Sequence, residues 1–147
     1  MRNNFVLYSK NMKTKENKKL YLYKKKEDAA VKKVEKWLRH YNLSYNLITP
    51  NTINETMIYH MLYCSDGGFS ELLVSQIKAE KVWQCHSRIK MDKITVSEMV
   101  KEIIKDPFLL RTPILFDEEK ILAGYNSEEI RKFLPKTYRI IGKEFKL

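Results

Sequence analysis

The stretch that decides the fold runs from Asp106 to Lys136 and reads DPFLLRTPILFDEEKILAGYNSEEIRKFLPK. It contains two short apolar runs, Ile114 to Phe116 and Lys120 to Ala123, on either side of the acidic segment Asp117-Glu118-Glu119. Apolar and aromatic runs that flank a few turn-forming residues are typical of a β-hairpin. The sequence therefore predicts two antiparallel strands joined by a tight turn.

A short helix is predicted directly after this hairpin, over residues 127–134. Gly124 breaks the second strand, and Ser127 is a good helix N-cap. Glu128 and Glu129 would occupy the first turn, where the helix dipole favours carboxylates, and Pro135 ends the helix. Its expected apolar face consists of Ile130, Phe133 and Leu134.

Working outward, the residues before this stretch predict a strand, a helix and a second strand. Leu20 to Tyr23 has the composition of a core strand, Asp28 is a candidate N-cap, and residues 43–48 read as the next strand. A strand–helix–strand unit of this length implies a right-handed crossover between parallel strands. The apolar residues at helical spacing are Ala30, Val34, Trp37, Leu38 and Tyr41.

The middle of the chain reads as a helical insert. We expect a helix from Pro50 to Tyr63, then a turn from Ser65 to Phe69 in which two glycines supply the positive φ. Residues 70–84 are loosely helical. Thr95, with Glu98 three residues later, predicts a capping box at the start of another helix.

Composition excludes several classes of protein. A length of 147 residues suits one domain, and the 44% of apolar residues is ordinary for a globular protein. No apolar run approaches the roughly 18 residues of a membrane-spanning helix, and the N-terminus lacks a signal-peptide core. Cys64 and Cys85 are too few for a disulfide framework, and no Cys/His cluster has zinc spacing. We expect a cytoplasmic protein without a cofactor or metal.

The net charge of +10 is concentrated at one end of the chain. Residues 1–40 hold 13 Lys/Arg against 4 Asp/Glu, a net of +9, and residues 41–147 hold 15 against 14, a net of +1. A basic field of this kind attracts nucleic acid or an acidic protein surface. A solvated, lysine-rich face without a partner would have the same composition.

The opening stretch resembles the C-terminal part of the Spx/ArsC family. In that family an LLRRP-like segment leads into a hairpin, and a helix of the pattern GYNxxEIRxFLP follows. The chain is more similar to the Spx branch, which consists of transcription regulators, than to the arsenate reductases. The matching residues are Gly124, Tyr125, Asn126, Glu129, Ile130, Arg131, Phe133, Leu134 and Pro135.

The resemblance implies an α/β fold, a thioredoxin-like (ArsC-like) small mixed four-stranded sheet with a helical insert. Residues 1–18 would be a basic N-terminal extension, and residues 19–147 a single domain. That domain would comprise a βαβ unit (20–48), the helical insert (51–106) and a β-hairpin with its helix (112–135). The strands are expected at residues 20–24, 44–48, 112–117 and 120–125.

The family's active site is degenerate in this chain. Laid against the family, the positions of its two cysteines hold Asp28 and Val31, so the nucleophilic thiolate and the CxxC switch are missing. Two arginines of the reductases correspond to Ala79 and Thr112. Without a thiolate and an arginine clamp, reduction of an oxyanion has no carrier. We therefore predict no catalytic residue and no enzymatic activity.

The resemblance instead implies a stress-response regulator that binds the C-terminal domain of the RNA polymerase α-subunit. In Spx-like proteins an Asp-Gly in the corresponding turn contacts that domain, which assigns Asp66 with Gly67 or Gly68 to the contact. A plain helix-linking turn is the other interpretation. Arg111 is a further candidate contact, and the family places a cis-proline at Pro113. We expect a monomer when the protein is free.

Two other hypotheses remain open from the sequence. The first is an ArsC-like thiol oxidoreductase that uses Cys64 or Cys85, which requires a thiol of low pKa near Asp28. The second is direct binding of nucleic acid by the basic N-terminal half. The lysines assigned to this possible DNA contact are Lys24, Lys25, Lys26, Lys32, Lys33 and Lys36.

Overall fold

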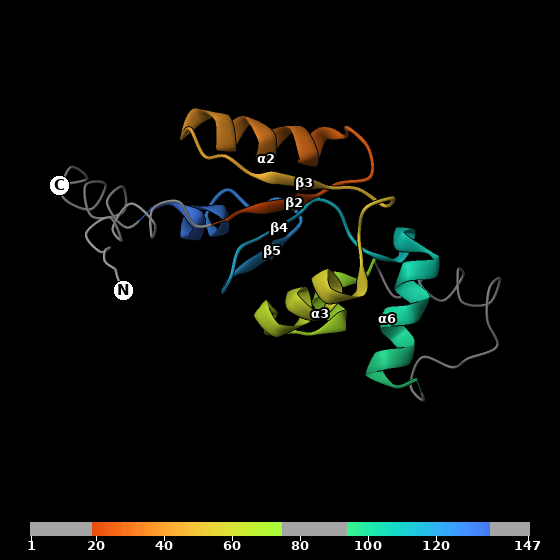
Figure 1. Ribbon diagram of the computed structural model, residues 1–147. Helices are drawn as coiled ribbons and strands as arrows, with labels where there is room; N and C mark the ends of the chain where they lie inside the picture. Colours follow the sequence, from red (N-terminus) through yellow and green to blue (C-terminus); the bar gives the residue numbers. More distant parts are fainter. Residues whose placement is uncertain (1–18, 75–93, 136–147) are drawn as a thin grey trace, which may run out of the picture.

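The computed structural model describes residues 19–74 and 94–135 (Figure 1). The predicted N-terminal extension, the whole segment 75–93 with Ala79 and Cys85, and residues 136–147 lie outside these residues. No helix in the described part is long and apolar enough to cross a membrane. In chain order the elements are β2 (Tyr21–Tyr23), α2 (Ala29–His40), β3 (Asn46–Ile48), α3 (Glu55–Cys64), α4 (Phe69–Leu72), α6 (Val96–Lys105), η2 (Pro107–Leu109), β4 (Ile114–Phe116), β5 (Ile121–Ala123) and η3 (Glu129–Phe133).

The described strands form one mixed sheet in the order β3-β2-β4-β5. Strand β2 pairs in parallel with β3, with Leu22 opposite Leu47, and antiparallel with β4, with Leu22 opposite Leu115. Strands β4 and β5 form the predicted hairpin. The four-stranded sheet, the parallel pair and the hairpin are therefore confirmed, and β2 lies at the centre of the sheet with a partner on either side.

Helices cover both faces of this sheet, α2 on one and α3 with α6 on the other (Figure 1). Neighbouring residues of β2 enter opposite layers, because side chains alternate along a strand. Leu22 packs with Val34 and Leu38 of α2, whereas Tyr23 packs in the layer formed by α3 and α6. Each fully buried side chain of this size contributes about 1.5–3 kcal/mol. The two layers hold α2 and β4 in fixed positions around the end of β2.

The connection from β2 to α2 is held by an ion pair. Lys24 follows β2 directly, and its Nζ lies 2.8 Å from Oε2 of Glu35, which is 9% exposed on the inner side of α2. Lys24 also pairs with Glu27 in the same loop. These two contacts, that with Glu27 first, raise the pKa of Lys24. The pair neutralises the one acidic side chain of α2 and fixes the loop that leads into the helix.

Two predicted helix starts are confirmed and one is wrong. Oδ1 of Asp28 accepts a hydrogen bond from Val31 N, and Thr95 forms the expected capping box with Glu98. The last helix, however, is not capped by Ser127. Oδ1 of Asn126 accepts hydrogen bonds from the two amides at 128 and 129, each at 2.9 Å, so the turn begins one residue earlier. The short segment before the proline then forms the 3-10 helix η3 rather than an α-helix.

The helical insert is present but less regular than predicted. The helix expected from Pro50 begins only at Glu55, because Thr49 and Thr52 form a hydrogen-bonded turn and Asn54 caps α3. The helical run expected over residues 70–84 is interrupted at Leu73, and its part from residue 75 onward lies outside the described residues. Helix α4 ends at Leu72, and Leu73 forms a β-bridge with Leu110. The chain thus leaves α4 directly beside the segment that precedes β4.

The ion pair of Lys24 leads to a prediction about stability. We expect Lys24→Met to lower the free energy of unfolding by about 1–3 kcal/mol, because Glu35 would stay nearly buried without its partner. The control is Lys26→Met, which removes an exposed lysine that pairs with no residue in the described part of the chain. Urea denaturation of both variants measures the difference. Equal midpoints for the two variants would contradict this role of Lys24.

Candidate functional site

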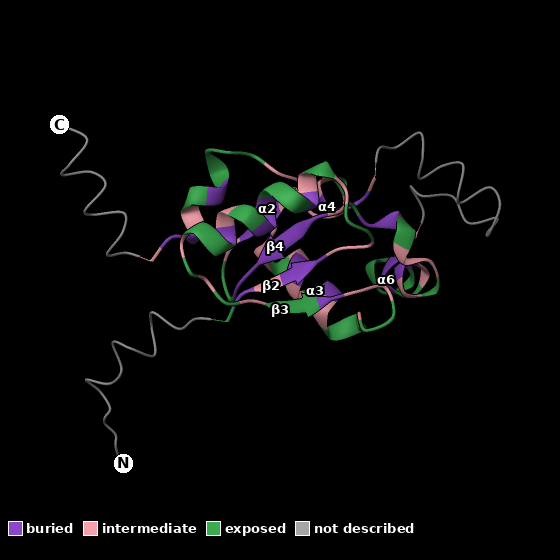
Figure 2. Ribbon diagram, turned by 90° about the horizontal axis from the view of Figure 1, so that it is seen from above, coloured by how far each residue is buried: buried purple, intermediate pink, exposed green. Residues whose placement is uncertain are grey.

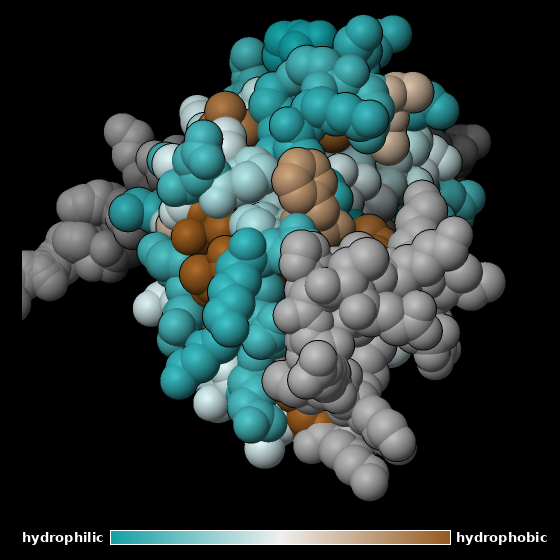
Figure 3. Space-filling view, turned by 90° about the vertical axis from the view of Figure 1, so that its right-hand side faces the viewer, coloured by the Kyte–Doolittle hydropathy of each residue, from teal (hydrophilic) through white to brown (hydrophobic). Residues whose placement is uncertain are grey.

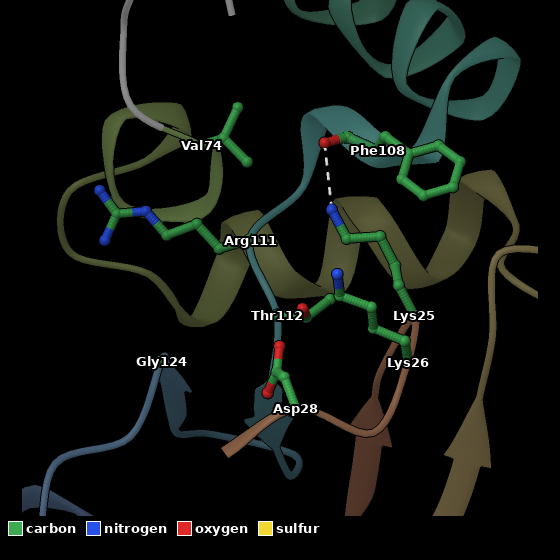
Figure 4. A pocket seen from close by; sticks show the side chains of 8 residues that line it. All are labelled: Lys25, Lys26, Asp28, Val74, Phe108, Arg111, Thr112 and Gly124. Carbon is green, nitrogen blue, oxygen red and sulfur yellow. Dashed lines mark hydrogen bonds between the residues drawn. The ribbon is translucent and has the colours of Figure 1, made fainter. Parts of the chain in front are cut away.

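A cavity of about 510 Å³ opens where the first turn of α2 meets the segment before β4 (Figure 4). It lies at the position that the family resemblance assigns to the active site. Residues from four separate parts of the chain line it. They are Lys25, Lys26, Asp28, Val74, Phe108, Arg111, Thr112 and Gly124.

Asp28 occupies the N-terminus of α2 in this cavity. Its Oδ1 accepts a hydrogen bond of 2.9 Å from Val31 N, and the negative charge is favourable at the positive end of the helix dipole. Val31 itself is fully buried. The two positions predicted to replace the family's cysteines therefore provide a helix cap and a core side chain, and neither offers a sulfur atom.

Arg111 lies at the edge of the cavity but is fixed to α4. Its backbone N–H donates to the carbonyl of Leu72 at 2.8 Å, and its Nε donates to the carbonyl of Leu73 at 2.7 Å. Figure 4 shows the guanidinium directed away from Asp28. The next residue, Thr112, has no cationic side chain, and its peptide bond to Pro113 is cis. Arg111 is thus the one arginine among the described residues that line the cavity.

The two lysines that line the cavity differ in their contacts: the side chain of Lys25 is hydrogen-bonded and that of Lys26 is exposed. Lys25 Nζ donates to the carbonyls of Phe108, at 3.2 Å, and Leu110, at 2.9 Å, and lies 5.1 Å from the centroid of the Phe108 ring. Lys26 is exposed, and its side chain makes no hydrogen bond or ion pair within residues 19–74 and 94–135. With Arg111, the described lining residues include three cations and one carboxylate, that of Asp28.

The turn at Asp66, Gly67 and Gly68 has two exposed residues, Asp66 and Gly67, and a half-buried one, Gly68, and hydrogen bonds fix its backbone. Gly68 has a positive φ of 64°, whereas Gly67 does not, so the prediction that both glycines supply a positive φ is correct for Gly68 alone. Ser65 Oγ accepts from Gly68 N and donates to Oε1 of Glu71, which also accepts from Gly67 N. Burial alone would raise the pKa of Glu71, but the hydrogen bonds from Ser65 and from the turn amides lower it overall. The charged carboxylate of Glu71 therefore holds the turn in one shape.

The turn at residues 66–68 and Arg111 both adjoin the short helix α4. Gly68 precedes α4, and the carbonyl of Leu72 at its last residue accepts from the Arg111 amide. Four helical residues rise about 6 Å. The predicted polymerase-contact residues thus lie at opposite ends of α4, and Arg111 also borders the cavity.

Cys64 lies away from the cavity. Its Sγ is 3.5 Å from Nε2 of His60 and 3.7 Å from the carbonyl of Asp117, next to the hairpin turn. Burial, and then the charges of Asp117 and Glu119, raise the pKa of the Cys64 thiol. This Cys–His pair was not predicted from the sequence, although residues 60 and 64 are four apart on one helix and so share a face. No group of three or more metal-ligating side chains occurs among the described residues.

Of the six lysines assigned to a DNA contact, Lys32, Lys33 and Lys36 are exposed on α2, whereas Lys24 and Lys25 are half-buried in the loop before it. Lys24 and Lys25 are held by partners within the domain, and Lys33 Nζ lies 5.7 Å from the Tyr125 ring centroid. Instead, the outer face of α2 is basic and exposed (Figures 2 and 3, where α2 lies at the top of Figure 3). Its only acidic residue, Glu35, points inward. The cationic or titratable residues of this face are Lys32, Lys33, Lys36, Arg39 and His40, the last two missed from the sequence.

Comparison with known proteins bears on the fold and the family. The model of the ArsC family matches residues 8–133. The global transcriptional regulator Spx 2 of Bacillus cereus is 30% identical over 120 residues, 80% of this chain and 88% of that protein. The global transcriptional regulator Spx of Streptococcus mutans is 32% identical over 113 residues, 75% of this chain and 79% of that protein.

Solved structures show the same fold at lower sequence identity. A possible arsenate reductase from Streptococcus mutans has a TM-score of 0.60 at 19% identity, over 78% of this chain and 98% of that chain. The arsenate reductase from Vibrio cholerae has a TM-score of 0.56 at 10% identity, over 80% and 98%. These likenesses confirm the thioredoxin-like ArsC fold that the sequence resemblance implied.

The environment of Cys64 predicts a slow thiol. In a Cys85→Ser variant, we expect Cys64 to react with an aromatic disulfide reagent at neutral pH about fivefold or more slowly than free cysteine, because its raised pKa leaves less thiolate. The rate should rise only as the pH passes above the range in which free cysteine ionises. Absorbance stopped-flow over a pH series measures it. A rate above that of free cysteine would revive the thiol hypothesis.

Proposed function

The chain belongs to the ArsC family, and from this premise we propose that it is an Spx-like transcription regulator rather than an arsenate reductase. It would act without catalysis, by binding the C-terminal domain of the RNA polymerase α-subunit. The relatives named as Spx regulators support the assignment to the Spx branch. The residues that line the cavity support a function without enzymatic activity.

The observation that carries the proposal is the carboxylate of Asp28 on the amide of Val31. Reduction of an oxyanion by this family requires a thiolate at the start of α2 as the nucleophile. Here that amide is already occupied by an oxygen ligand from the chain itself, and the second family position is a buried valine. A carboxylate forms no disulfide, so the first turn of α2 has no redox reaction available to it.

The surface proposed for the polymerase contact is the exposed turn with Arg111. Asp66 and Gly67 are exposed, and Glu71 and Ser65 hold their backbone in place. A preformed turn loses little conformational entropy when a partner binds. Arg111, at the other end of α4, adds an exposed guanidinium within reach of the same partner.

A second contact is favoured by the basic face of α2. Its lysines and Arg39 point outward, and Glu35 is neutralised by Lys24 on the inner side. A face of one sign attracts DNA phosphates without reading sequence. We infer that, when the protein is bound to the polymerase, this face contacts the DNA backbone nearby.

A titration with the isolated C-terminal domain of the α-subunit tests the polymerase contact. We expect a Kd in the micromolar range, and a loss of tenfold or more, about 1.4 kcal/mol, for Asp66→Arg and Gly67→Arg. The matched control is Ser97→Arg, which adds the same side chain to an exposed site on α6. Isothermal titration calorimetry gives Kd, and circular dichroism checks that each variant is folded. Equal affinity for all of these variants would reject the turn as the contact, and no binding by the unmodified chain would reject the function.

The salt dependence of DNA binding tests the α2 face. In the triple variant Lys32→Gln, Lys36→Gln, Arg39→Gln, we expect the slope of log K against log salt for a short duplex to fall by about 2–3. The control is Lys101→Gln with Lys105→Gln on α6, which removes exposed charge elsewhere. Fluorescence anisotropy at several salt concentrations measures the slopes. An unchanged slope in the triple variant would remove α2 from the DNA contact.

A further inference from the structure

Phe108 is an exposed aromatic side chain at the mouth of the cavity. It is 62% exposed, although a phenylalanine is normally buried. It lies in η2 and lines the cavity beside Arg111 and Lys26. A large apolar side chain beside cationic groups has the composition of a hot spot in a protein interface. The polymerase contact proposed above does not use it.

The backbone around Phe108 is fixed from several directions. Phe108 N donates to Oδ1 of Asp106, and Lys25 Nζ donates to the carbonyls of Phe108 and Leu110. The neighbouring side chains of Leu109 and Leu110 are buried. The ring is therefore presented on a rigid turn, so a partner that covers it gains apolar burial at little cost in backbone entropy.

The charged residues that line the cavity indicate which polar group a ligand should carry. Arg111 and Lys26 are exposed, and among the described lining residues the one carboxylate, that of Asp28, has Oδ1 on the amide of Val31. Lys25 adds a third positive charge, although it donates hydrogen bonds to two backbone carbonyls. The excess of two positive charges among these described residues favours a ligand that carries a carboxylate.

We propose that this cavity, with Phe108 at its rim, is a docking socket for an acidic segment of a partner protein. A carboxylate of the segment enters beside Lys26 and Arg111, and an adjacent apolar side chain packs on the exposed Phe108 ring. The socket goes beyond the polymerase contact and does not depend on it, since it would receive any partner with this chemistry.

A protein segment fits these features better than an inorganic oxyanion. Arg111 uses Nε for the carbonyl of Leu73 and points away from Asp28, so its cation lies at the edge of the cavity rather than around an ion held inside it. The Asp28 carboxylate would also repel a multiply charged anion that enters fully. An inorganic ion, finally, gains nothing from an exposed Phe108, whereas a peptide does.

The test is an NMR titration of the full-length ¹⁵N-labelled protein with blocked peptides. The probe is acetyl-Leu-Asp-Asp-Leu-amide, its matched control is acetyl-Leu-Asn-Asn-Leu-amide, and the third arm is inorganic phosphate. We expect the acidic peptide to shift the amides of Lys26, Arg111 and Gly124, and the amide-bearing control to bind about tenfold more weakly. Phe108→Ala should weaken the acidic peptide about fivefold or more. Tyr63→Ala, which removes a 79% exposed aromatic on α3, should not.

Each other result would overturn the socket. Equal binding of the two peptides would show that charge does not matter, and equal effects of Phe108→Ala and Tyr63→Ala would show that the aromatic anchor does not. Saturation by phosphate alone would identify the cavity as a retained oxyanion site. Shifts confined to the α2 residues from Lys32 to His40 would mean that the peptide binds only the basic helix face. Since no polymerase component is present, these outcomes are independent of the polymerase contact.

Discussion

The central strand β2 pairs with β3 on one side and with β4 on the other. Because both edges of β2 are occupied, the position and direction of the loop that follows it are fixed by the sheet. It delivers the first turn of α2 to the point where the segment before β4 passes, and the cavity forms there. Lys24 fixes this loop through Glu35, and Lys25 ties it to the carbonyls of Phe108 and Leu110. Residues far apart in the chain are thereby held around the first turn of α2. The side chains at this turn determine which reaction or ligand the cavity can support.

In this chain the first turn of α2 has no thiol at positions 28 and 31, and the amide of Val31 already has a hydrogen-bond acceptor. Asp28 satisfies the amide of Val31 with its own oxygen, so the helix N-terminus is provided with an anion by the chain. The thioredoxin-like frame of the ArsC family remains, with its cis-proline and its hairpin, while the thiol is absent from these positions. What is left is a set of fixed surfaces: the turn before α4, the rim at Phe108 and the outer face of α2. The proposed function uses these surfaces for binding.

Local chemistry explains why some features were predictable from the sequence. The hairpin follows from its turn, because Oδ1 of Asp117 accepts from the amides of residues 119 and 120, an interaction that needs no distant partner. The caps at Asp28 and Thr95 are local in the same way. Asn126 and Ser127 are both good caps in adjacent positions, so the choice between them depends on the packing of the following turn. The sequence pattern alone does not make that choice.

The parts of the site that were not predictable depend on long-range contacts. Lys25 and Phe108 are 83 positions apart, and Arg111 and Leu73 are 38 apart, so no periodicity relates them. The basic run at 24–26 therefore reads as free charge in the sequence, although two of its lysines are engaged in the fold. The basic face of α2 could be predicted only in part. Its lysines are evident from the sequence, but the inward direction of Glu35 depends on packing.

The most direct test of a redox-blind regulator is the affinity of the unmodified chain for the C-terminal domain of the polymerase α-subunit under two conditions. One titration contains excess dithiothreitol and the other a thiol oxidant such as diamide, with the α-domain's own cysteines blocked. If Asp28 has replaced the thiol switch, the two Kd values should agree within about twofold. A tenfold difference between them would contradict this, and would place a redox-active thiol of this chain in control of binding.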